Sequence, residues 1–173
     1  MEDAVEDLLR GDTTAFQRIV DATSARFVRV GARMLGSIAD AEDVVQEAYV
    51  KAYRSLLAGQ FDRRSKVETW LFRIVLNTAI DAKRKRGPAK VDADTLVDLG
   101  WDGNASAEAR LALKELANWL GELPEDQRTA LLLKAVEGMS SAEIAEVMEC
   151  TEGAVEQRLV RARATLRERR NQR

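Results

Sequence analysis

Arginine is concentrated at the C-terminal end of the sequence, in a position where it could bind phosphate. Residues 157–173 hold seven arginines and a single acidic residue, Glu168, although the whole chain carries a formal net charge of -2. Arginine side chains neutralise backbone phosphates and hydrogen-bond to the edges of bases. Because the positive charge is local rather than general, the sequence predicts a confined nucleic-acid surface on this segment.

These arginines follow a pattern typical of a helix-turn-helix. A capping box of Ser140 and Glu143 predicts a short helix over 140–148, and Thr151 is a suitable N-cap for a longer helix over 151–169. In this motif the second helix enters the major groove and its first residues approach the base edges. The alternative is that the arginines only solvate the outer face of a bundle helix. The candidate contacts to duplex DNA are Thr151, Glu152, Ala154, Gln157, Arg158, Arg161 and Arg163.

A second basic segment, 67–86, carries an aromatic residue, an amide and several cations along one helical line. Helical periodicity predicts a core stripe formed by Val67, Leu71, Ile74, Thr78 and Ala82. A second line, which we name the polar stripe and which includes the basic end of the helix, consists of Trp70, Arg73, Asn77, Asp81, Lys83 and Arg84. Such a surface can stack an unpaired base and steer the phosphates of a single strand. Trp70 could instead be an ordinary core residue.

The break before this helix, Ser55–Lys66, is polar and contains one aromatic residue. Phe61 stands there with Arg63 and Arg64 close behind it. One interpretation is a pocket for an extruded base, with these three residues as contacts. The other is a loop that Phe61 pins to the core.

The helix predicted over 40–56 has two distinct faces. Its apolar face consists of Val44, Val45, Ala48, Tyr49, Ala52 and Tyr53. Its other face, which we name the acidic face, consists of Asp43, Gln46 and Glu47, with Lys51 beside them. This face could bind a partner, or it could be a solvated surface that an i,i+4 pair between Glu47 and Lys51 stabilises.

The residue types needed for hydrolytic or metal chemistry are nearly missing from the sequence. It has no histidine and one cysteine, Cys150, which excludes an internal disulfide, a multi-Cys/His zinc site and the commonest general base. No nucleophile–base constellation is apparent, so we expect no catalysis, no metal and no cofactor. Cys150 is expected to be a small buried hydrophobe in the turn, with a redox switch as the alternative.

These segments must be positioned by helices, because no strand-like alternation is convincing anywhere. Hydrophobic residues make up 46% and charged residues 32% of the chain, and there are only two prolines; this composition favours an all-α protein of few, long helices. We expect two small helical domains, 1–86 and 108–173, joined by an acidic linker over 87–107. The apolar residues of the linker, which we expect to pack on one domain, are Leu96, Val97, Leu99 and Trp101.

The first residues, MEDAVEDLLRGD, lack the basic and apolar regions of a signal peptide. No apolar run approaches the ~18 residues of a membrane span. We therefore expect a cytoplasmic protein without membrane insertion.

Three segments together resemble the extracytoplasmic-function (ECF) sigma factors of bacterial RNA polymerase. They are DAEDVVQEAYVKAYRSL (40–56), VETWLFRIVLNTAIDAKRKR (67–86) and LPEDQRTALLLKAVEGMSSAEIAEVMECTEGAVEQRLVRARATLRER (123–169). The resemblance covers nearly the whole chain outside the linker. It implies an all-α protein with a region 2 domain over 1–86 and a region 4 domain over 108–173.

The resemblance also implies a role for each candidate surface. The acidic face matches the family's contact to core RNA polymerase, and the polar stripe matches its recognition and melting of the minus-ten element. The Ser55–Lys66 break matches the loop that captures a flipped non-template base. The final helix matches the reader of the minus-thirty-five duplex, and an anti-sigma factor is implied as a regulatory partner.

The sequence departs from the family pattern in the helix-turn-helix. Glu149 stands where the family usually has a turn glycine, so a residue with a side chain must bend there, at about 1–3 kcal/mol if its backbone is left-handed. Glu156 and Gln157 replace a common Lys and Ser. Glu156 could accept a hydrogen bond from a cytosine amino group, or it could point away from DNA.

The sequence therefore favours a sigma factor that binds core RNA polymerase and directs promoter-specific initiation without catalysis of its own. The alternative is a free-standing transcriptional regulator that binds DNA through residues 140–169 and dimerises through its first domain. Such a regulator would bind its operator without polymerase.

Overall fold

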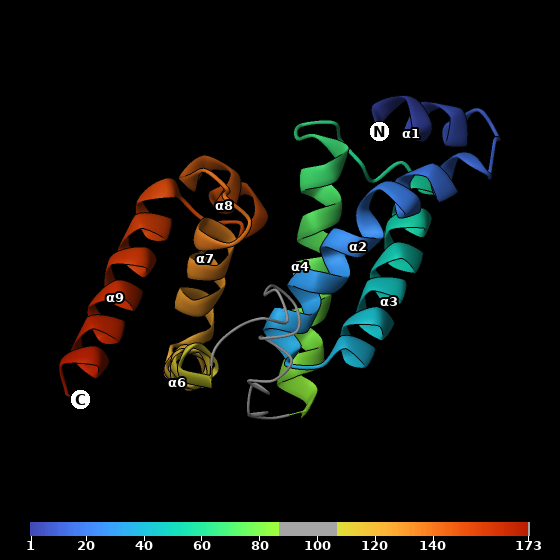
Figure 1. Ribbon diagram of the computed structural model, residues 1–173. Coiled ribbons are helices and arrows are strands. Elements are labelled where there is room, and N and C mark those ends of the chain that lie inside the picture. Colours follow the sequence, from blue (N-terminus) through green and yellow to red (C-terminus); the bar gives the residue numbers. More distant parts are fainter. Residues whose placement is uncertain (87–106, 173) are drawn as a thin grey trace. The chain divides into compact units, whose positions relative to one another are not determined.

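The structure, a computed structural model, describes residues 1–86 and 107–172, and within these ranges every regular element is a helix (Figure 1). The prediction of an all-α protein is confirmed. The chain divides into two compact units, Met1–Ala89 and Lys90–Arg173. The expected packing of Leu96, Val97, Leu99 and Trp101 lies outside the described residues.

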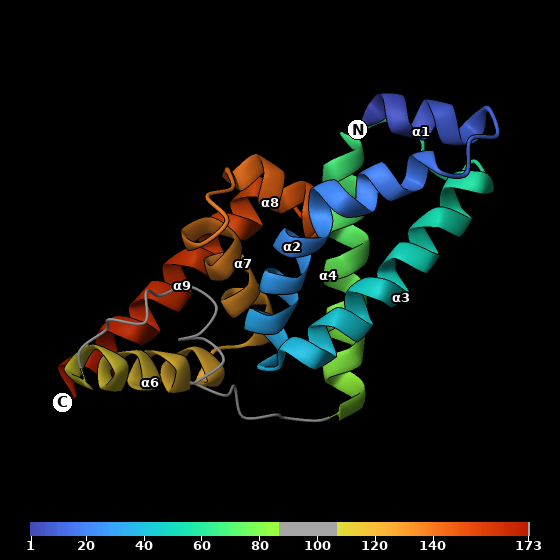
Figure 2. The ribbon, with the colours of Figure 1, turned by 45° about the vertical axis from the view of Figure 1, so that its right-hand side comes forward.

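The first unit is a bundle of three long helices with a short helix at one end. The short helix is α1 (Glu2–Leu9), and the long helices are α2 (Ala15–Leu35), α3 (Ile38–Leu57) and α4 (Val67–Arg86). The three long helices pack against one another, and α1 lies across the end of the bundle where α3 finishes and α4 starts (Figures 1 and 2). Because α3 continues to Leu57, the loop before α4 covers residues 58–66 and is shorter than the sequence predicts.

The core of the first unit is aromatic. Phe27 of α2 is fully buried, and its ring meets that of Phe72 on α4 edge-on, with 5.5 Å between the ring centroids. The buried hydroxyls of Thr23 and Tyr49 satisfy each other at 2.6 Å, which removes the cost of two unpaired polar groups in the core. Side chains of all three long helices therefore contact one another in this core.

The break between α2 and α3 is formed by two residues with specific backbone roles. Gly36 ends α2 in the left-handed conformation (φ 76°), where glycine carries no steric penalty. Ser37 then begins α3, and its side chain accepts a hydrogen bond from the backbone N–H of Asp40. The turn predicted at this position is confirmed.

Helix α4 is buried over a wider face than its periodicity predicts. Thr78, Leu71 and Val67 of the expected core stripe are buried, but Ile74 and Ala82 are only half-buried. Because α4 packs against both α2 and α3, its buried set also includes Trp70, Phe72, Val75, Leu76 and Ala79. The single-stripe prediction is wrong for this helix, since two neighbours bury two adjoining faces.

The described part of the second unit, residues 107–172, contains four helices. They are α6 (Ala107–Glu122), α7 (Glu125–Ala135), α8 (Ser141–Val147) and α9 (Glu152–Asn171). Helices α7 and α8 pack against α9, and α6 contacts α9 through an ion pair between Glu122 and Arg169 at 2.6 Å. The predicted capping box of Ser140 and Glu143 and the predicted Thr151 N-cap are both confirmed.

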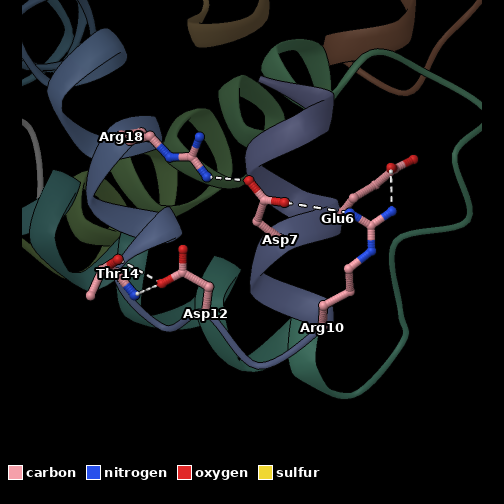
Figure 3. A network of polar contacts seen from close by, with 6 residues as sticks. All are labelled: Glu6, Asp7, Arg10, Asp12, Thr14 and Arg18. Carbon is pink, nitrogen blue, oxygen red and sulfur yellow. Dashed lines mark hydrogen bonds and ion pairs between the residues drawn. The ribbon is translucent and has the colours of Figure 1, made fainter.

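Polar side chains fasten α1 to the start of α2 (Figure 3). Asp7 of α1 pairs with Arg18 of α2 and with Arg10. Just before α2, one carboxylate oxygen of Asp12 accepts hydrogen bonds from the hydroxyl of Thr14 at 2.6 Å and from its backbone N–H at 3.0 Å. The hydroxyl hydrogen bond, helped by the backbone one and by the nearby charge of Arg18, holds the pKa of Asp12 below its ordinary value.

This lowered pKa predicts that the stability of the protein falls in acid. The folded state favours the ionised carboxylate, so the contribution is present above the ordinary pKa of Asp12 and is lost as pH falls through the lowered value. We expect Asp12→Asn to flatten the acid limb of the stability profile, measured by urea unfolding at a series of pH values below neutrality. Thr14→Val should flatten the same limb, and the double variant should add little more. An acid limb unchanged in both single variants would contradict the assignment.

Candidate nucleic-acid interface

The acidic face of α3 is exposed. Asp43, Gln46 and Glu47 are all accessible, while the opposite face of the helix is buried in the bundle. The ammonium group of Lys51 lies 2.7 Å from a carboxylate oxygen of Glu47 and 3.3 Å from the hydroxyl of Thr78 on α4. The hydrogen bond from Lys51 and its charge hold the pKa of Glu47 below its ordinary value. Glu47 therefore stays ionised on this exposed face.

The polar stripe on α4 is exposed only along part of its length. Asn77, Asp81 and Arg84 are exposed, while Arg73 and Lys83 are half-buried. The ammonium group of Lys83 donates to the main-chain carbonyl of Met34 at 3.3 Å. Exposed amide, carboxylate and guanidinium groups therefore share the distal half of the helix.

Trp70 differs from the rest of the stripe because it is buried, with 6% of its surface exposed. Its ring contacts that of Phe61, with 5.1 Å between the centroids. Trp70 is buried because α4 packs against both α2 and α3, and the loop over residues 58–66 covers it. Phe61 is half-buried and rests on Trp70, which agrees with a loop that Phe61 pins to the core. The other interpretation, a pocket for an extruded base, stays a prediction.

The 58–66 loop contains a strained residue. Arg63 has φ 58°, a left-handed conformation that non-glycine residues rarely adopt. Arg63 and Arg64 are both exposed, and the backbone N–H of Arg64 donates to the Asp62 carboxylate at 3.1 Å. Strained loop residues persist only where the surrounding structure holds them.

The residues that hold this loop come from α1, and no motif or spacing in the sequence points to them. A carboxylate oxygen of Glu2 accepts the backbone N–H of Val67 at 3.3 Å, and Glu6 pairs with Arg63 at 3.6 Å. Carboxylates on consecutive turns of a helix are common on any solvated surface. The role of Glu2 and Glu6 in holding the loop becomes apparent only from the structure, in which α1 packs beside the loop.

The turn of the helix-turn-helix has the predicted bend. Glu149 is left-handed (φ 51°), as expected for a residue in the place of a turn glycine. The next N–H, that of Cys150, donates to the carbonyl of Ala145 at 3.0 Å. Val155 and Leu159 of α9 are buried together with Ile144 of α8, so the two helices are held by apolar contacts across the turn.

Most of the candidate contacts on α9 are exposed. Ala154 is half-buried, and the accessible residues are Thr151, Glu152, Gln157, Arg161 and Arg163. Val160, which is not among the candidate contacts, is 62% exposed among these polar residues. An exposed apolar residue within a basic helix was the available signal, since such a side chain can contact a thymine methyl group.

Two residues of α9 bond within their own unit. The guanidinium group of Arg158 donates to Asp126 of α7 at 2.9 Å and to the sulfur of Cys150 at 2.8 Å. Glu156 accepts a hydrogen bond from the hydroxyl of Ser141 on α8. Of the two alternatives for Glu156, this geometry favours a carboxylate that points away from DNA. The two hydrogen bonds of Arg158 therefore connect α9 to α7 and to the turn before α9.

The described residues were also compared with the requirements of a membrane span and of a metal site, and neither is met. Within residues 1–86 and 107–172, no helix is both long and apolar enough to cross a membrane. In the same ranges, no group of three or more His, Cys, Asp and Glu side chains could hold a metal ion.

Comparison with known proteins identifies the family. Residues 19–88 match the family model for sigma-70 region 2, and residues 113–166 match the model for sigma-70 region 4. The chain is 36% identical to the RNA polymerase sigma-H factor of Pseudomonas aeruginosa, over 94% of this chain and 89% of that protein. It is 34% identical to the ECF RNA polymerase sigma factor SigW of Bacillus subtilis, over 94% and 92% of the two chains. The chain belongs to the ECF sigma factors.

Solved structures agree with this assignment of an ECF sigma factor. The structure of CnrH in complex with the cytosolic domain of CnrY matches with a TM-score of 0.71 and 29% identity, covering 97% of this chain and 95% of that one. The sigma factor RpoE from Bartonella quintana, in complex with the anti-sigma factor NepR, matches with a TM-score of 0.65 and 26% identity, covering 90% and 96%. As an ECF sigma factor, the chain binds core RNA polymerase and directs transcription initiation at specific promoters.

The left-handed turn of this sigma factor predicts an unusual effect of a glycine substitution. Glu149→Gly relieves the backbone strain, so the free energy of unfolding of the second unit should rise by roughly 1 kcal/mol. The measurement is urea unfolding of the full chain followed by far-UV circular dichroism. The matched control is Gly138→Ala, where φ is 67° and an added Cβ would meet no atom within 4 Å; backbone strain alone should lower stability by about 1 kcal/mol. A loss of stability in Glu149→Gly would contradict the strain.

Proposed function

We propose that the two units of this sigma factor divide promoter recognition between them. The first, over 1–86, binds the polymerase through the acidic face and opens the minus-ten element along the polar stripe. The second, over 108–173, reads the minus-thirty-five element as duplex. The boundaries are supported by the matched regions, 19–88 and 113–166.

The observation that carries this division is the distribution of exposed groups in the first unit. The acidic face of α3 and the exposed end of the polar stripe on α4 belong to one rigid bundle, and Lys51 bonds to residues on both helices. A polymerase bound to α3 would therefore hold α4 in a fixed orientation. A separate basic helix, α9, supplies duplex contacts through Arg161 and Arg163.

Opening of promoter DNA in this way requires binding energy and no catalysis by the sigma factor. Unstacking a base costs a few kcal/mol per step, and capture of the unstacked base on an aromatic or polar surface offsets that cost. Asn77 and Asp81 offer hydrogen-bonding groups, and Arg84 offers a phosphate contact. The protein acts as a non-enzymatic subunit in the cytoplasm, where transcription takes place.

An anti-sigma factor is the regulatory partner that we infer. The support is that the sigma factor RpoE of Bartonella quintana is in complex with the anti-sigma factor NepR in a structure that this chain resembles over 90% of its length. Such a partner would cover surfaces that polymerase or DNA otherwise contacts. Co-purification from cells that express the full chain would identify it.

The proposed polymerase contact predicts a specific loss of binding. Replacement of both Asp43 and Glu47 by alanine removes two exposed charges, and we expect affinity for core RNA polymerase to fall about tenfold or more. The measurement is fluorescence anisotropy of the labelled full chain titrated with core enzyme. The matched control is Asp21→Ala, an exposed carboxylate on α2 outside the acidic face. Equal losses in the double variant and the control would contradict this contact.

The polar stripe predicts a separation of promoter opening from duplex binding. Run-off transcription of genomic fragments with core enzyme first supplies start sites and their two shared upstream elements. On such a promoter, we expect Asn77→Ala to reduce opening, measured by permanganate reactivity, roughly five- to tenfold because a base contact is lost. Closed-complex formation should change little.

The control for this experiment is Gln17→Ala, which removes an exposed amide from α2. It should leave both opening and closed-complex formation unchanged. Equal losses of both steps in Asn77→Ala would contradict the placement of Asn77 in the melting surface.

A further inference from the structure

A row of arginines on α2 lies beside the polar stripe of α4. The row, which we name the basic ridge, consists of Arg26, Arg29 and Arg33. Residues spaced by three and four positions share one face of a helix. This face is next to α4, because Arg26 forms an ion pair with Glu68 and its guanidinium carbon lies 5.3 Å from the centre of the Phe72 ring. Figures 1 and 2 both show α2 alongside α4.

Two contacts fix the position of the basic ridge along α4. The pair of Arg26 with Glu68 joins the two helices near the start of α4. Near its end, Lys83 donates to the main-chain carbonyl of Met34. The rest of the ridge lies between these contacts on α2, and Asn77 of the polar stripe lies between them on α4. The ridge and the stripe therefore run side by side.

Arg29 is the exposed member of the basic ridge, whereas Arg26 and Arg33 are half-buried. The guanidinium group of Arg29 makes no hydrogen bond or ion pair with another residue of 1–86 or 107–172. Its charge is therefore available to an anion from another molecule. A phosphate of a nucleic acid is a suitable anion, because its binding to arginine also releases a condensed counterion.

The two edges of the polar stripe differ in charge. On the edge next to α2, Arg73 directly follows Phe72, whose ring contacts a ring of α2. On the edge next to α3, Asp81 lies three residues after Thr78, whose hydroxyl accepts a hydrogen bond from Lys51 of α3. A chain of phosphates along α4 is therefore attracted to the α2 edge and repelled from the α3 edge.

We propose that the basic ridge binds, through Arg29 and Arg33, the backbone phosphates of the unpaired strand that lies along the polar stripe. The phosphates of this strand point towards α2, and its bases lie over Asn77 and Asp81. The inference rests on the proposed function, because only an opened promoter presents a single strand to α4. It adds α2 to the DNA-binding surface. The added contact has no base preference, since every nucleotide carries the same phosphate.

The test uses the holoenzyme formed by the full chain and core polymerase. Its probes are promoter DNAs with a preformed bubble across the minus-ten element, and the measurement is affinity at a series of salt concentrations. Each phosphate contact to a single strand adds about 0.7 to the slope of log affinity against log salt. We expect Arg29→Gln to reduce the slope by about 0.7 and to weaken binding roughly fivefold at about 0.1 M salt. Addition of Arg33→Gln should bring the reduction in slope to about 1.4.

Three comparisons separate a phosphate contact from other effects. Arg29→Lys keeps the charge, so it should keep most of the slope. The matched control is Arg10→Gln, which removes an exposed cation from α1, outside the ridge, and should leave the slope unchanged. On a second bubble with a different minus-ten sequence, Arg29→Gln should weaken binding by the same factor as on the first. If the double variant does not fold, the single change at the exposed Arg29 is sufficient for the test.

The outcomes distinguish this inference from the proposed function. A wild-type holoenzyme that does not prefer bubble DNA to the fully paired promoter contradicts the proposed function. A holoenzyme that prefers the bubble but keeps its full slope in Arg29→Gln overturns the present inference alone. An equal loss on the fully paired promoter also overturns it, because the ridge would then bind duplex phosphates. So does a loss of affinity for core polymerase in place of DNA.

Discussion

The packing of α4 against two neighbouring helices is the constraint on which the first unit depends. Burial on two sides leaves a narrow exposed line on α4, and Asn77, Asp81 and Arg84 are exposed on it. The same packing buries Trp70, whose ring then supports Phe61 and the loop above it. One set of apolar contacts therefore determines both the exposed line and the position of the loop.

Much of this arrangement follows from local sequence signals. The apolar face of α3, the Gly36-Ser37 turn, the Ser140 and Glu143 capping box and the Thr151 cap were predictable, because each depends on residues a few positions apart. The width of the buried face of α4 was not, since it depends on how many helices surround that segment. The pairings of Glu2 and Glu6 with the loop depend on a return of the chain across about sixty residues, and periodicity carries no such information.

Helix α9 shows the same limit of prediction from sequence within the helix-turn-helix. Its fold was evident from the caps and the apolar spacing, but the direction of individual side chains was not. Arg158 bonds to Asp126 and Cys150, and Glu156 bonds to Ser141, so both residues contribute to the rigidity of the unit. The surface that we propose for DNA is correspondingly smaller, and Val160, an apolar residue, is exposed beside it.

The position of α1 has a consequence for where the first folding unit begins. The region 2 match starts at residue 19, yet Val5 and Leu8 of α1 are buried, and Asp7 pairs with Arg18. A fragment cut at the match boundary would expose the core surface that these side chains cover and would leave the 58–66 loop without its carboxylate partners. The cooperative unit is thus larger than the segment that defines the family, and a stable excised domain must include the chain from α1 onward.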